Sequence, residues 1–275
     1  MVEWRNGGKG LTNWSGSCMI FVCLYEVNNT KNPSKKGMET DMSERKQAPE
    51  TPWYLRPFGP LVSLALLCVV WGVYGKARLS GRRTRAQRAW QVVSQGCVYD
   101  LGRDLTRHNC FRYCNRGSLS SAYFAQATAA LSDGYIYLAL THSNSPAGEV
   151  IGLFTGRAYN HISLAFDRAL KTLVSYNGGE GGEAPGLNPE TLKGLAERKG
   201  ASVRVYRLAA TRHQKQIMLK RLRKINQEGS AYNLLGLLFP MSCQPNIMFC
   251  SQFVYAMLRL AGLHYFRKNP LQVRP

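Results

Sequence analysis

A run of 17 residues without a charged side chain, from Gly59 to Gly75, limits most strongly what this chain can fold into. A helix rises 1.5 Å per residue, so the run reaches about 25 Å, slightly short of a hydrocarbon core of ~30 Å. Aromatic residues that suit the membrane interfaces extend or flank it: Trp53, Tyr54, Trp71 and Tyr74. We therefore expect residues 53–75 to form a single transmembrane anchor, with a buried core helix as the alternative.

The distribution of basic residues predicts the orientation of this anchor. Residues 39–58 contain three Lys or Arg, and residues 76–95 contain six. Because positive charge collects on the cytoplasmic side, we expect the C-terminal domain to be cytoplasmic. The whole chain has 36 Lys+Arg against 16 Asp+Glu, which favours an anionic partner. No nucleic-acid-binding signature accompanies the basic runs, so an anionic membrane surface is the expected partner and nucleic acid is not.

Composition divides the rest of the chain into segments. Residues 1–52 are polar, charged and without periodicity, which predicts a disordered tail. We expect residues 76–133 to form a basic juxtamembrane segment followed by helices. The eight cysteines are scattered and form no disulfide framework, which fits a reducing compartment. The run HNCFRYC (108–114) lacks the second ligand pair of a zinc finger or ribbon, so we expect no metal site.

Residues 134–275 alternate between β-rich runs and helical patterns. The expected strands are 135–143, 161–166, 169–177 and 202–208. The expected helices are 146–156, 188–199 with Asn188 as cap, 211–229 with a Thr211–Gln214 capping box, and a last helix that begins at Cys250 and ends at Gly262. This order predicts an α+β fold with an antiparallel sheet packed against helices.

The last of these helices has a cysteine at its first residue. The segment before Cys250 contains the structure-breaking QPN, and the apolar helical pattern FVYAMLRLAG follows it. A thiol at a helix N-terminus lies at the positive end of the helix dipole, where thiolate is stabilised. Such a nucleophile needs a base, and His161 at the start of an expected strand is the first choice, with His142 at the end of another strand as the second.

The segments YNHISLAF and FCSQFVYAMLRLAGL together resemble the circularly permuted branch of the NlpC-type papain-like superfamily, which includes bacterial proteins related to lecithin retinol acyltransferase. The resemblance covers approximately residues 135–263. It implies a permuted papain-like fold in which His161 is the base and Cys250, last in the chain, is the nucleophile. Relatives often use a His, Glu or Gln as the third, orienting residue. The strand after His161 offers Ser175 and Asn177 for that role, with Thr172 earlier, and none of these residues is charged.

Three further residues are expected near the site. The resemblance implies that Tyr232 lines it or donates to the oxyanion, and packing under the sheet is the alternative. Tyr159, two residues before His161, and Ser251, directly after Cys250, are the other expected substrate-binding residues. The main-chain N–H of Cys250 or Ser251 would meet the oxyanion.

The sequence thus predicts a membrane-anchored, bacterial-type thiol hydrolase or acyltransferase, without cofactor, that acts on an amide or ester. A membrane lipid or a lipid-linked or peptide substrate is expected. The alternatives are a peptidoglycan or peptide amidase, and a non-catalytic lipid-binding or regulatory module on the same fold. The sequence leaves the oligomeric state open.

Overall fold

A computed structural model describes residues 58–100, 108, 111–142, 146–155, 159–179, 183–196, 201–234, 236, 242, 244–265 and 267–273. The expected disordered tail, residues 1–52, lies outside these ranges. Five strands form one sheet in the order β4-β3-β2-β1-β5, and every neighbouring pair is antiparallel. The strands are β1 Tyr135–His142, β2 His161–Ala165, β3 Val174–Asn177, β4 Gly186–Pro189 and β5 Ser202–Ala209. Two short strands, β6 Ala231–Tyr232 and β7 Ile247–Met248, pair in parallel beside it.

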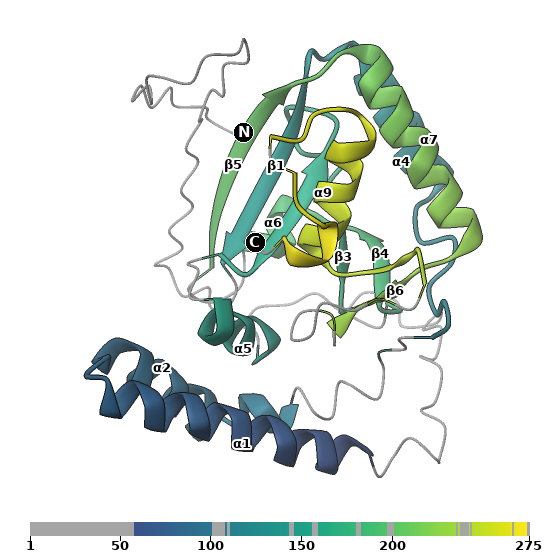
Figure 1. The fold of residues 1–275 in the computed structure, drawn as a ribbon. Coiled ribbons are helices and arrows are strands. Elements are labelled where there is room, and N and C mark those ends of the chain that lie inside the picture. Colours follow the sequence, from purple (N-terminus) through teal and green to yellow (C-terminus); the bar gives the residue numbers. More distant parts are fainter. Residues whose placement is uncertain are drawn as a thin grey trace, which may run out of the picture.

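The helices confirm the α+β class (Figure 1). They are α1 Phe58–Leu79, α2 Arg83–Ser94, α4 Ser121–Ala129, α5 Pro146–Thr155, α6 Leu192–Ala196, α7 Arg212–Glu228 and α9 Cys250–Leu260, with 3-10 turns η2 Ala130–Ser132 and η4 Pro270–Gln272. The capping box that starts α7 is confirmed. The Thr211 hydroxyl accepts from the Gln214 N–H at 3.2 Å, and the Gln214 side chain accepts from the Thr211 N–H at 2.9 Å.

Two expected elements differ from the structure. The strand predicted for 169–177 begins only at Val174, because the Asp167 carboxylate accepts from the N–H groups of Lys171 and Thr172 and holds the preceding residues in a turn. The helix predicted to start at Asn188 is wrong, since residues 186–189 pair with β3 as β4 and the helix starts only at Leu192. Strand pairing therefore overrides the local Asn-Pro helix signal at this point.

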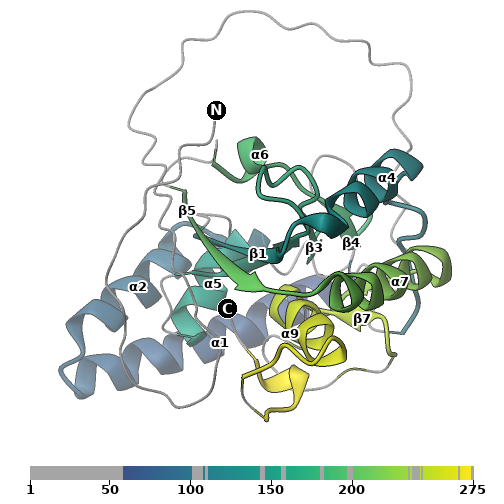
Figure 2. The same ribbon diagram turned by 90° about the horizontal axis from the view of Figure 1, so that it is seen from above.

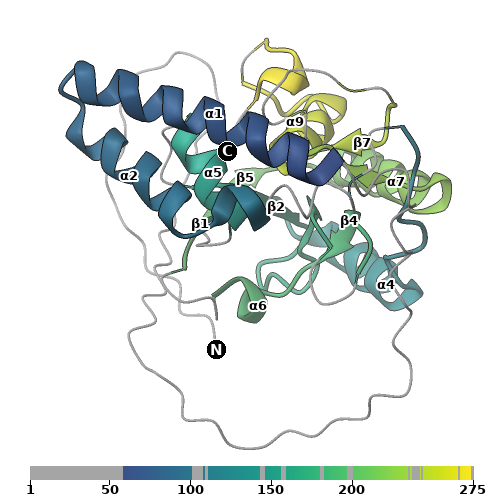
Figure 3. The ribbon, with the colours of Figure 1, turned by 90° about the horizontal axis from the view of Figure 1, so that it is seen from below.

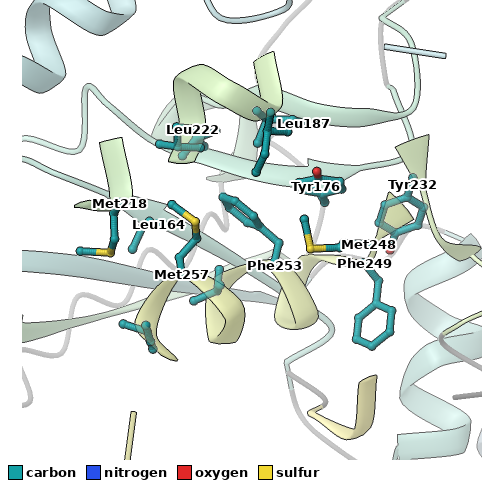
Figure 4. Close-up of a cluster of buried hydrophobic side chains, with 14 of the residues drawn as sticks. Leu164, Tyr176, Leu187, Met218, Leu222, Tyr232, Met248, Phe249, Phe253 and Met257 are labelled. Carbon is teal, nitrogen blue, oxygen red and sulfur yellow. The ribbon is translucent and has the colours of Figure 1, made fainter. Parts of the chain in front are cut away.

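Helices cover both faces of the sheet (Figure 2). On one face α9 lies against β2 and β3, and α7 packs beside α9. On the other face Leu195 of α6 packs against Val203 and Val205 of β5. Figure 4 shows the first of these layers, where side chains of the sheet, α7 and α9 meet. Within it the rings of Tyr176 and Phe253 lie 5.0 Å apart, and truncating a buried Phe of this kind typically costs 3–5 kcal/mol.

A buried lysine joins α7 to the sheet. Lys215 has no exposed surface, and its ammonium group donates to four main-chain carbonyl oxygens at 2.6–2.8 Å. These belong to Ala130, Asp133, Tyr135 and Phe166, which lie in η2, before β1, in β1 and after β2. Burial lowers the pKa of this ammonium group. The apolar face of α7 thus carries one charged group, and hydrogen bonds satisfy it.

The helices α1 and α2 form an antiparallel hairpin that lies below the sheet in the view of Figure 1 and faces the reader in Figure 3. Leu66 and Val70 of α1 and Val92 of α2 belong to the same core cluster as the sheet and α9. None of the described helices is both long and apolar enough to span a membrane. The anchor expected at 53–75 stays a prediction, because residues 53–57 lie outside the described ranges.

Candidate functional site

Cys250 is the first residue of α9, as the sequence predicted. The residue before it, Phe249, has extended backbone and gives no side-chain cap to the first turn. The N–H groups of that turn consequently receive no acceptor from the cap residue. The positive end of the helix dipole and these N–H groups lie next to the sulfur, an arrangement that stabilises negative charge.

His161 is the first residue of β2, the strand against which α9 packs. It pairs with Thr141 near the end of β1. The ring lies close enough to the Cys250 thiol for that thiol to raise the pKa of the imidazole, so two side chains 89 residues apart in sequence come together here. Because Nε2 contacts a carboxylate, Nδ1 is the ring nitrogen left for the thiol.

The carboxylate at this site is that of Glu190, directly after β4. Its Oε1 lies 2.9 Å from Nε2 of His161, and its Oε2 lies 3.2 Å from the same nitrogen. The carboxylate also accepts hydrogen bonds from three side chains of β2 and β3: Ser175 at 2.7 Å, Asn177 at 3.0 Å, and Ser163. Ser175 and Asn177, the two residues expected to orient the imidazole, both donate to this carboxylate, which itself lies against Nε2 of His161.

The electrostatics of the pair favour charge on both partners. Burial lowers the pKa of His161, but the Glu190 charge, the nearby Cys250 thiol and the hydrogen bond to Glu190 outweigh it, so the pKa lies well above the usual 6.5. Burial raises the pKa of Glu190, but the His161 charge and hydrogen bonds from His161, Ser163 and Asn177 lower it to about 2. An imidazolium–carboxylate pair is therefore the preferred state near neutral pH.

A chain of three amides, two of them buried, extends from this carboxylate into the segment before α4. Asn177 Oδ1 accepts from Asn188 Nδ2 at 2.8 Å, and Asn188 Oδ1 accepts from Asn115 Nδ2 at 2.8 Å. The Asn115 amide also donates to the carbonyls of Ala184 at 2.9 Å and of Leu187 at 3.1 Å. The position of Glu190 thus depends on residues outside the sheet.

The sulfur of this site is covered. Cys250 is 1% exposed, whereas the side chains of His161 and Glu190 are 16% and 9% exposed. Ser251 does not face a substrate space, because its hydroxyl donates to the Val273 carbonyl at 2.7 Å and so ties the C-terminal segment to the start of α9. The C-terminal segment therefore lies against the end of α9 that carries Cys250.

Tyr232 and Tyr159, the other expected site residues, each pack beside a side chain outside the His161–Cys250 pair. The Tyr232 ring packs beside His108, with centroids 5.5 Å apart, and is buried. The Tyr159 ring lies under the guanidinium of Arg204 on β5, 5.5 Å from it. An open depression of about 780 Å³ between α4 and α7 includes neither His161 nor Cys250. Within the described part of the chain, no cluster of three or more His, Cys, Asp or Glu could hold a metal ion.

Glu190 is the functional residue that the sequence reading missed. The NPETL segment suggested a helix start, which would have placed Glu190 in the first turn of a surface helix. The signal that could have found it is the charge itself: Glu190 is the first acidic residue after the Gly-rich sequence 178–186, where a strand returns beside the one that carries Ser175 and Asn177.

Comparison of the chain with family models, with curated proteins and with solved structures finds no match. The fold and the site therefore define a class only: an α+β protein in which a strand histidine, backed by a carboxylate, contacts a cysteine at a helix N-terminus.

Proposed function

We propose that this protein is a cysteine hydrolase or acyltransferase of the permuted papain-like kind, acting on an amide or ester. The observation that carries the proposal is the series Glu190–His161–Cys250, in which Glu190 is hydrogen-bonded to His161 and Cys250 lies close enough to raise the pKa of the imidazole. A nucleophile, a base and a group that orients the base are the three parts that thiol catalysis needs. The order along the chain also supports the proposal, because the strand that carries the histidine, β2, comes before the helix that carries the cysteine, α9.

In the proposed resting site, the proton of Cys250 has already passed to Nδ1 of His161, and Glu190 stabilises the resulting imidazolium through Nε2–H. The thiolate attacks the acyl carbonyl carbon, a C–S bond forms, and the carbonyl electrons move to oxygen. The N–H groups of Cys250 and Ser251 at the start of α9 meet this oxyanion, an interaction typically worth ~3 kcal/mol of barrier.

The tetrahedral intermediate then collapses, and the leaving alcohol or amine takes the proton from His161. The product is a thioester on Cys250. Water, or an acceptor alcohol or amine, attacks this thioester with His161 again as base, and the acyl group leaves the enzyme. The choice of acceptor decides between hydrolysis and transfer.

A soluble activated ester gives the direct test of this proposal. Purified protein is incubated with p-nitrophenyl acyl esters, and the intact mass is recorded. We expect a hydroxylamine-sensitive acyl adduct on Cys250 that is absent in Cys250→Ser and strongly reduced in His161→Ala. Cys114→Ser changes a partly buried cysteine elsewhere in the chain; it is the matched control and should retain the adduct. Full turnover by Cys250→Ser would refute the assignment.

A non-catalytic lipid-binding or regulatory module on the same fold is the second candidate, and the 1% exposure of Cys250 favours it. Alkylation by iodoacetamide, read peptide by peptide, separates the two. A catalytic Cys250 reacts faster than Cys68, Cys97 and Cys114 and loses that advantage in His161→Ala. In a non-catalytic module the covered Cys250 reacts more slowly than the exposed Cys68.

A further inference from the structure

The α1–α2 hairpin has one side committed to the protein core and one side exposed. The buried side consists of small and apolar residues that recur at helical spacing: Leu66, Val70 and Ala77 on α1, and Ala86, Ala89 and Val92 on α2. A turn with Gly81 at a φ of 69° joins the helices. Since α2 also packs on α5, the hairpin forms a fixed layer on this side of the molecule (Figure 3).

The exposed side of this layer is apolar and aromatic. Large apolar side chains there are 43–60% exposed: Leu64, Trp71 and Trp90. Trp71 contacts both Tyr74 and Trp90, with ring centroids 5.3 Å and 6.1 Å apart, so one aromatic cluster bridges the two helices. An exposed apolar group of this kind on a helix pair marks an interaction surface. Tryptophan and tyrosine are the residues that prefer a lipid–water interface.

The charges around this surface have one sign. Residues 58–99 contain no Asp or Glu and six basic residues, Lys76, Arg78, Arg82, Arg83, Arg85 and Arg88. All six are exposed, and they lie at the end of α1, in the turn and along α2. Basic side chains beside exposed aromatic groups match a surface that presents anions above an apolar layer, as anionic lipids do.

We infer that the α1–α2 hairpin docks the protein on an anionic lipid bilayer, with α1 lying along the surface. Because the face of α1 that carries Leu66 and Val70 packs into the core, only its opposite face is open to lipid. Trp71 and Trp90 insert at the interface, and the arginines of the turn and α2 contact the lipid phosphates. The inference does not depend on whether Cys250 is catalytic.

Flotation of the full chain with lipid vesicles tests this docking. We expect binding to phosphatidylcholine vesicles that contain phosphatidylglycerol, release by high salt, and little binding to phosphatidylcholine alone. One basic residue near an anionic surface contributes about 1 kcal/mol, or about fivefold in partitioning. Replacing Arg82, Arg83, Arg85 and Arg88 with Gln should therefore weaken binding by at least about tenfold. Trp71→Ala with Trp90→Ala should weaken binding and also remove a blue shift of the tryptophan emission.

The matched control neutralises four exposed basic residues on α7, Arg212, Lys220, Arg223 and Lys224, and should keep nearly full binding. Equal loss in the α7 variant would overturn the assignment to the hairpin. Retention of the wild-type chain on vesicles after alkaline carbonate extraction would indicate a spanning anchor instead. If the protein is a dimer in lipid-free solution and the Trp71 and Trp90 substitutions make it monomeric, the exposed face of the hairpin binds a second copy of the chain instead.

Two readouts separate this inference from the proposed catalysis. Cys250→Ser should lose the acyl adduct and still float with anionic vesicles. The hairpin variants should float poorly and still form the adduct with a soluble ester, which also shows that they are folded.

Discussion

Replacing Glu190 with glutamine removes the charge that holds His161 protonated, while it keeps a side chain of nearly the same size. The pKa of this carboxyl falls from an ordinary 4.5 to about 2 in the folded protein. At roughly 1.4 kcal/mol per pKa unit, that difference corresponds to roughly 3 kcal/mol of interaction with its surroundings. His161 supplies the largest favourable part of it.

The same interaction raises the pKa of His161, so Glu190→Gln should lower that pKa and weaken the support for a thiolate on Cys250. Glutamine still accepts a hydrogen bond from Nε2–H, which retains the ring orientation in part. We expect alkylation of Cys250 at neutral pH to slow by about tenfold to a hundredfold, and the pH dependence of the rate to change with the lowered pKa of His161. Stopped alkylation at a series of pH values, read by peptide mass, measures both effects.

The control for this experiment is Glu228→Gln, which neutralises a carboxylate that is 44% exposed at the end of α7. It should leave the alkylation rate and its pH dependence unchanged. A Glu190→Gln protein with the wild-type rate and profile would show that the carboxylate does not act on the His161–Cys250 pair.

Three other changes have expected outcomes. Lys215→Met leaves four carbonyl oxygens without their donor and should lower the free energy of unfolding, measured by urea titration, by about 3 kcal/mol or more. The exposed control Lys220→Met should lower it by less than ~0.5 kcal/mol. Equal losses in the two variants would contradict the role of Lys215 in the core. Deleting residues 264–275 should raise the accessibility of Cys250 and speed its alkylation, and an unchanged rate would mean that other segments cover the sulfur. Because the Glu190 pKa is depressed, its stabilisation is complete above about pH 4.5 and lost as the pH falls towards 2. Wild type should therefore lose more unfolding free energy over that interval than Glu190→Gln, and parallel curves would refute the coupling.

The sequence predicted the elements whose signals are local. The strands at 135–143 and 202–208 are runs of β-rich residues with clear ends, and the start of α7 carries its capping box, so each agrees with the structure within a residue or two. Cys250 was predictable for the same reason, because the break before it and the apolar pattern after it are adjacent in sequence.

The role of Glu190 is not a local property. The sequence of residues 188–190 is typical of a helix start. In the structure, Asn188 instead pairs with Ser175, so the segment forms the end of strand β4. That register brings Glu190 to the donors Ser175 and Asn177. One sequence contains no direct record of strand register, so the nature of the third residue could not be derived from it.

The amide chain from Asn115 through Asn188 to Asn177 means that the site begins well before the first strand. Asn115 lies twenty residues upstream of β1, yet its side chain fixes the β4 segment that supplies Glu190. A shortened protein that starts at residue 134 would still contain every reacting group, but it would lack Asn115 and its hydrogen bonds to the β4 segment. Such a fragment would serve as a poor reagent for judging activity, and screening should use chains that begin ahead of this asparagine.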